Sequence, residues 1–172
     1  VDGDEKFGPT DFFQPDSGRS DLKAWQKKFQ RHMRLLQRPR YVHEQSVLPE
    51  FQQRDSREYF IKGHFVPVRD DLDKAAWKEL SYEEMEKCYA EALGMTDELV
   101  AEVNEGLKEL DEMIYSEDCC TEGGLSYDDI DLWARMRSIT IVKGVKVPEK
   151  LAKYQENLSR KGDVPLYWSC AI

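Results

Sequence analysis

GLSYDDIDLWARMRSITIVKGVKVPEK, residues 124–150, starts with a short polar cluster and then becomes almost entirely apolar. Ser126 and Asp129 have the spacing of a capping box, in which a Ser and an acid three residues later satisfy the free N–H groups at a helix start. Apolar residues follow at helical spacing and also on the other helix faces: Ile130, Trp133, Met136 and Ile139, then Leu132, Ile141 and Val142. This pattern predicts a capped helix, extending towards Gly144, in the middle of a helical bundle. We assign the cap to folding and not to catalysis.

The composition limits the classes of protein to which the chain can belong. Its 172 residues are enough for one domain with a substantial core, with or without an appendage. The net charge of -9 disfavours nucleic acid or an anionic membrane surface as the main partner. Neither a membrane-spanning run nor a signal peptide is present in the sequence. We therefore expect a cytoplasmic protein with no nucleic acid and no membrane partner.

The four cysteines do not form the dense pattern of a secreted disulfide scaffold. The adjacent pair Cys119 and Cys120 allows a redox or metal hypothesis. However, neighbouring residues chelate one metal poorly, and no Cys or His lies at zinc-ligand spacing nearby. We favour a structural role for the pair and assign no metal.

The remaining sequence also has helical periodicity. Residues 1–19 contain three Gly and two Pro among polar residues, as a linker does. Ser20 can cap a helix that should end near Arg38, before Pro39. Further helices are predicted over residues 55–62, 81–93, 96–114 and 148–162. No segment has the period of a strand, so the predicted fold class is all-α.

Known catalytic motifs are missing from the sequence. It contains no G-x-S-x-G, no H-E-x-x-H, no phosphate-binding glycine loop and no C-x-x-C. Taken alone, the residues predict an acidic helical domain whose function they do not identify.

A resemblance to a known family adds to this interpretation. The Ser126-x-x-Asp129 box resembles the folding signature of the C-terminal helical domain of glutathione transferases (GST). DDIDLWARMRSITIVKGVKVPEKLAKYQENL and the ending CAI are similar to the C-terminal half of GST-like bacterial glutaredoxins, the two-domain type of enteric bacteria. The resemblance extends through LKAWQKKF, LLQRPRY and REYFIKG. It therefore implies a GST C-terminal-like helical bundle over residues 20–172.

The resemblance also implies what precedes this domain. In such glutaredoxins a thioredoxin-like domain carries C-P-Y-C and most of the glutathione site. Residues 1–19 would be the linker and the remnant of this missing domain, with Val1 and Asp2 ending its last helix. The chain would wall the interdomain cleft of a glutathione-dependent disulfide oxidoreductase and stabilise its partner, the thioredoxin-like domain. Glutathione would be the cosubstrate of the full-length protein, and this chain would hold no cofactor.

The resemblance leads to two further expectations. Without the low-pKa thiol, the chain alone should be inactive. Absence of the partner domain should expose an apolar patch beside the first helix and favour self-association. A freestanding GST-C-like protein-interaction module remains an alternative.

Cationic residues of the first helix are the candidate ligand or interdomain-cleft residues. This helix borders the cleft in the family, and cations suit an anionic tripeptide. The alternative is that they are solvated charges paired with nearby acids. The candidates are Arg31, Arg34 and Arg38 on this helix, together with Arg40 and the uncharged Tyr41 just beyond Pro39.

Overall fold

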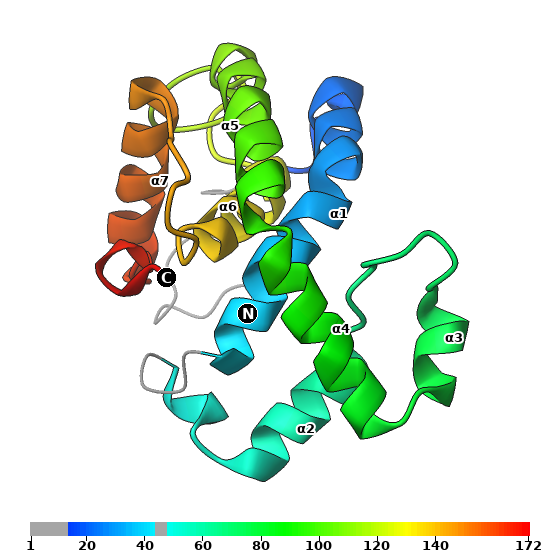
Figure 1. Ribbon diagram of the computed structural model, residues 1–172. Helices are drawn as coiled ribbons and strands as arrows, with labels where there is room; N and C mark the ends of the chain where they lie inside the picture. Colours follow the sequence, from blue (N-terminus) through cyan, green and yellow to red (C-terminus); the bar gives the residue numbers. More distant parts are fainter. Residues whose placement is uncertain (1–13, 44–47) are drawn as a thin grey trace.

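The computed structural model describes residues 14–43 and 48–172, and Figure 1 shows the arrangement of their helices. Within these ranges the regular structure is helical except for one isolated β-bridge. The all-α prediction is therefore confirmed, whereas the prediction for Val1 and Asp2 lies outside the described residues. In chain order the helices are α1 (Ser20–His43), η2 (Pro49–Phe51), α2 (Arg54–Gly63), α3 (Lys74–Glu79), α4 (Tyr82–Gly94), α5 (Thr96–Met113), α6 (Tyr127–Ile139), α7 (Glu149–Gly162) and η3 (Trp168–Cys170).

Helix α1 is the central element of the bundle. Its main contacts are with α5, α4 and α6. In Figure 1 α5 lies beside its N-terminal half and α4 crosses its C-terminal half, whereas α7 lies beyond α5 and α6, and α3 lies beyond α4. The stripe predicted to face inward is buried, because residues three or four apart share one face of a helix. It comprises Leu22, Trp25, Phe29, Met33 and Leu36.

The prediction that the first helix ends before Pro39 is wrong, because α1 continues through Pro39 to His43. A proline has no N–H to donate to the carbonyl four residues earlier, here that of Leu35. Both residues are buried, so packing offsets part of this loss. The Arg40 guanidinium also donates a hydrogen bond of 2.7 Å to the adjacent carbonyl of Leu36.

Helices α1 and α5 approach closely at Gly106. The indole N–H of Trp25 donates to the Gly106 carbonyl at 2.8 Å. A Cβ atom at Gly106 would lie only 2.2 to 2.6 Å from ring atoms of Phe29. The absence of a side chain at Gly106 therefore sets the distance between the two helices.

The start of α6 is a buried polar hub centred on Asp129. Ser126 is the N-cap residue in a capping box, and its N–H and hydroxyl donate to Oδ2 of Asp129 at 2.8 and 3.1 Å. Oδ1 of Asp129 accepts from the Cys120 N–H at 2.6 Å and the Tyr154 hydroxyl at 3.0 Å. One carboxylate thus joins α6, the turn before it, and α7.

The other end of α6 differs from the prediction. The helix stops at Ile139 and does not extend towards Gly144. The Thr140 hydroxyl donates to the Arg137 carbonyl, and Gly144 adopts a positive φ of 92°. A short hydroxyl side chain that bonds the preceding turn competes with continued helix formation. Ile141 and Val142, which the prediction placed in the helix, are instead buried in the following turn.

Residues 14–19 lie on the helical domain just before α1. Gln14 pairs in parallel with Ser126. The N–H and hydroxyl of Ser17 donate to Oδ2 of Asp128 at 2.8 and 2.7 Å. The Arg19 guanidinium donates to the carbonyls of Cys120 and Met113 at 2.8 and 2.9 Å. The second half of the predicted linker is therefore attached to the N-terminus of α6 and the turn before it.

Candidate functional site

Three of the candidate arginines contact one segment, residues 65–67, which precedes α3. Nε of Arg31 donates to the Pro67 carbonyl at 3.1 Å, and Nη1 of Arg38 donates to the Phe65 carbonyl. The Arg34 guanidinium carbon lies 5.8 Å from the centre of the Phe65 ring, within the range of a cation–π interaction. Arg31, Arg34 and Arg38 therefore form a continuous cationic strip along α1.

Arg135 of α6 lies close enough to extend this strip. Burial lowers the pKa of Arg34, and the positive charge of Arg135 lowers it further. Burial likewise lowers the pKa of Arg38, with a further effect from Arg34. We call Arg34, Arg38 and Arg135 the arginine cluster. No local pattern in the sequence singles out Arg135, because the packing of α6 against α1 is a tertiary contact.

The arginine cluster has unused hydrogen-bond donors. The Nε atoms of Arg38 and Arg135 are buried and have no partner among the described residues. Arg135 forms an ion pair of 3.1 Å with Asp131. Within residues 14–43 and 48–172, however, no carboxylate lies at ion-pair distance from Arg31, Arg34 or Arg38, and the arginine ion pairs there are those of Arg19, Arg54, Arg69 and Arg135. The positive charges of Arg31, Arg34 and Arg38 are therefore not balanced by a described carboxylate, which favours an anion beside them.

Arg40 lies apart from the cluster. It is only 4% exposed and donates to Leu36, Thr96 and Ile172. These bonds connect α1 to the start of α5 and to the C-terminal segment. The guanidinium of Arg40 is therefore buried, and it donates to acceptors within the domain.

Tyr41 belongs to an aromatic group near the C-terminal end of α1. Its ring centre lies 6.0 to 6.3 Å from those of Phe51, Phe60 and Tyr167. Burial raises the pKa of the Tyr41 hydroxyl, which therefore stays protonated at neutral pH. Among the described residues, the ring of Tyr41 therefore packs on other aromatic rings, and its recorded contacts do not include the arginine cluster.

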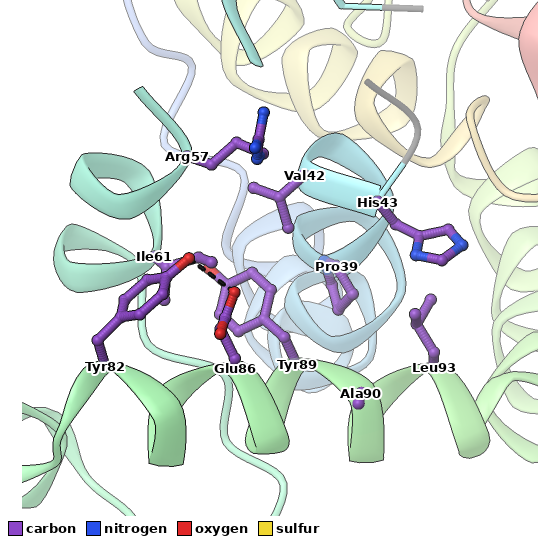
Figure 2. A pocket seen from close by; sticks show the side chains of 10 residues that line it. All are labelled: Pro39, Val42, His43, Arg57, Ile61, Tyr82, Glu86, Tyr89, Ala90 and Leu93. Carbon is purple, nitrogen blue, oxygen red and sulfur yellow. Dashed lines mark hydrogen bonds between the residues drawn. The ribbon is translucent and has the colours of Figure 1, made fainter. Parts of the chain in front are cut away.

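A separate pocket of about 240 Å³ lies between α1, α2 and α4 (Figure 2). Polar side chains from all three helices surround an apolar floor. Oη of Tyr82 donates to Oε1 of Glu86 at 2.7 Å, and burial, with this bond, raises the pKa of Tyr82 to about 12. The described lining residues include no cysteine. They are Pro39, Val42, His43, Arg57, Ile61, Tyr82, Glu86, Tyr89, Ala90 and Leu93.

The cysteines are not placed as nucleophiles. Cys88, Cys119 and Cys120 are buried, and Cys170 is half-buried with its thiol donating to the Tyr167 carbonyl. Burial raises the pKa of the Cys120 thiol, and the charge of Asp129 raises it further. Such an environment disfavours the thiolate, which is the reactive form. The main-chain bonds of Cys120 instead fasten the turn before α6.

Residues 14–43 and 48–172 lack both a metal-ligand cluster and a membrane-spanning helix. No three His, Cys, Asp or Glu side chains are grouped there as metal ligands. None of the helices in those ranges combines the length and apolar character needed to cross a bilayer.

Comparison with known proteins places the chain in a family. Residues 73–171 match the family described as glutaredoxin 2, C terminal domain. Glutaredoxin 2 of Escherichia coli K12 is 28% identical over 151 residues, which are 88% of this chain and 60% of that protein; proteins of two other E. coli strains give the same values. The crystal structure of glutaredoxin 2 from Salmonella typhimurium in complex with glutathione aligns with a TM-score of 0.72 and 24% identity, covering 97% of this chain and 66% of that one. The chain thus spans about three fifths of the curated relatives' length, and by its family match it belongs to the glutaredoxin 2 C-terminal domains.

Proposed function

We propose that this chain is the helical part of a two-domain, glutathione-dependent disulfide oxidoreductase, in which it walls the interdomain cleft and stabilises a thioredoxin-like domain. Membership of the glutaredoxin family supports this function over a freestanding interaction module. The buried cysteines also support a division of labour, in which the thioredoxin-like domain supplies the attacking thiol. Glutathione-dependent exchange operates in a reducing compartment, so we expect the parent protein in the cytoplasm.

The arginine cluster is the observation that carries the proposed position of the cleft. Guanidinium groups that lie close together repel one another, and the packing of α1 against α6 holds these three near each other without a described carboxylate on Arg34 or Arg38. An anionic ligand beside these guanidinium groups would relieve this repulsion. Glutathione carries carboxylates, so it suits this surface. The proposed cleft surface comprises Arg31, Arg34, Arg38 and Arg135.

Hydrogen exchange tests where the cleft lies. Exchange rates are measured in two proteins: the chain alone, and the chain joined to the thioredoxin-like domain of E. coli glutaredoxin 2. We expect slower exchange in α1 and α6 of the joined protein, because the second domain would cover them. Protection restricted to α5 would show that the cleft has been placed on the wrong face. The isolated chain should also self-associate through the uncovered face, and the joined protein should be monomeric by light scattering.

A charge substitution tests the ligand role. Arg34→Gln in the joined protein should raise the KM for a glutathione mixed disulfide several-fold and leave kcat nearly unchanged, since a positioning charge would be lost. Lys27→Gln is the matched control, because it removes the same charge from an exposed position of α1. Equal KM values for the two variants would exclude Arg34 from the glutathione site.

A further inference from the structure

Residues 14–19, which we call the strap, are bonded to the helical domain at three points. The main chain of Gln14 forms two hydrogen bonds, of 2.7 and 3.2 Å, with the main chain at the start of α6. The N–H and hydroxyl of Ser17 donate to the carboxylate of Asp128. The Arg19 guanidinium donates to two main-chain carbonyls, at the end of α5 and in the turn before α6. The strap therefore lies along the N-terminus of α6 over its whole length.

The carboxylate of Asp128 binds the strap more closely than it binds its own helix. Its Oδ2 accepts from the N–H and the hydroxyl of Ser17 at 2.8 and 2.7 Å, whereas the Ser126 hydroxyl lies 3.4 Å away. Asp128 is only 8% exposed, and the capping box of α6 is completed by Asp129 instead. A buried carboxylate whose two short bonds both come from the strap is an anchor for that segment.

The anchor lies on the face of α6 that carries Arg135 of the arginine cluster. Asp128 and Arg135 are seven positions apart, and a helix of about 3.6 residues per turn brings such residues onto nearly the same face. A rise of about 1.5 Å per residue separates them by only about 10 Å along the helix axis. The strap therefore joins the domain close to the proposed cleft surface.

We propose that Asp128 is a positioning residue, which anchors the segment between the two domains and so keeps the thioredoxin-like domain near the cleft surface. This inference rests on the proposed function. Release of residues 14–18 would lengthen the free connection by up to about 17 Å, because an extended chain reaches about 3.4 Å per residue. A longer connection lowers the effective concentration of one domain at the surface of the other. The anchor thereby favours docking of the two domains without contacting the substrate.

Hydrogen exchange on the chain alone tests the anchor independently of the second domain. Asp128→Ala removes the acceptor of both Ser17 bonds, so exchange in residues 14–19 should be accelerated several-fold. Glu83→Ala is the matched control, because Glu83 is also an acid at the second position of a helix, α4, but is exposed. Both variants lose a favourable charge at a helix N-terminus, and only one loses the anchor. Equal exchange of the strap in the two variants would overturn the proposal.

The joined two-domain protein tests the positioning role. Asp128→Ala should raise the KM for a glutathione mixed disulfide several-fold and leave kcat nearly unchanged, because fewer molecules have their domains docked before the substrate binds. Hydrogen exchange in α1 and α6 should also be faster than in the unaltered joined protein. Glu83→Ala should change neither quantity.

A substitution in the strap tests the same bonds without altering α6. In the joined protein Ser17→Ala should raise the KM less than Asp128→Ala does, since the Ser17 N–H can still donate. Ser17→Thr keeps a hydroxyl and should restore the KM. An unchanged KM for both Asp128→Ala and Ser17→Ala in an active joined protein would overturn the positioning role and leave the proposed function standing. An inactive unaltered joined protein would overturn the proposed function and the positioning role together.

Discussion

The hydroxyl of Tyr154 on α7 donates a hydrogen bond of 3.0 Å to Oδ1 of Asp129 on α6, and both residues are buried. Burial raises the pKa of this phenol, and the nearby charge of Asp129 raises it further. Tyr154 therefore stays a neutral donor at physiological pH. The bond connects the last long helix to the carboxylate that also caps α6.

Removal of the Asp129 carboxylate should destabilise the domain more than loss of the Tyr154 hydroxyl. Asp129→Ala leaves the buried N–H groups of Ser126 and Cys120 without an acceptor, and each costs about 1–3 kcal/mol. Tyr154→Phe removes one hydrogen bond to a charged group and should cost about 1.5–3 kcal/mol. Urea unfolding measures both, with the exposed Asp131→Asn as control. A larger cost for Tyr154→Phe would contradict the central role of Asp129.

Ser126→Ala tests the other half of the capping box. Loss of an N-cap side chain typically costs about 0.5–2 kcal/mol, and we expect a value in this range. The Asp129 carboxylate still accepts the Ser126 N–H in this variant, so the cost should stay below that of Asp129→Ala. An unchanged urea midpoint would mean that the serine hydroxyl adds nothing to the cap.

Gly106→Ala should destabilise the domain although alanine favours helices by about 1 kcal/mol over glycine. The new Cβ would overlap the Phe29 ring and force α1 and α5 apart, at a typical cost of about 1–3 kcal/mol. Thermal unfolding of Gly106→Ala, Phe29→Leu and the double variant measures the coupling. The double variant should be more stable than the sum of the single effects predicts, whereas strict additivity would contradict the predicted clash.

Asp21 should contribute to the acid sensitivity of the fold. The Arg19 side chain donates to its carboxylate and lowers the pKa of Asp21 to about 2. Since the folded-state pKa lies below the unfolded value near 3.8, the contribution is present above about pH 4 and is lost between about pH 4 and 2. Asp21→Asn should make the free energy of unfolding less dependent on pH over this window. The effect should be small because half of the side chain is exposed, and an unchanged pH profile would contradict it.

The isolated chain should not reduce a glutathione mixed disulfide above the uncatalysed rate. Its buried thiols lack the environment that produces a reactive thiolate. A coupled assay with glutathione and glutathione reductase tests this, with the joined two-domain protein as the positive control. Turnover that Cys119→Ser or Cys120→Ser abolishes would contradict the prediction.

Local signals in the sequence predicted much of this fold. Ser81 with Glu84 and Ser126 with Asp129 mark helix starts by a chemistry that acts within one turn. The amphipathic stripe that begins at Thr96 likewise predicted α5, which starts at that residue. Such signals depend on the chain within a few residues, so a single sequence is enough to locate them.

Distant contacts set the features that the sequence did not reveal. A proline usually ends a helix. At Pro39, however, buried packing and the hydrogen bond from the Arg40 guanidinium to the Leu36 carbonyl allow α1 to continue. Gly106 appeared as an ordinary helix residue, since its role depends on Phe29 of another helix. The arginine cluster likewise requires α6 to pack beside α1. Periodicity shows which face of a helix is apolar and does not show which helix will cover it.

Asp128 and Asp129 are consecutive, yet they face different parts of the molecule. Asp129 points inward to Tyr154 and Cys120, and Asp128 binds Ser17 of the preceding segment. The attachment of that segment and the cap of α6 therefore share one helical turn. When this turn opens, the bonds of Ser17 to Asp128 are lost with it, so the lifetime of those bonds cannot exceed that of the folded turn. Loss of the Asp128 carboxylate, in contrast, would shorten the lifetime of the attachment while α6 stays folded.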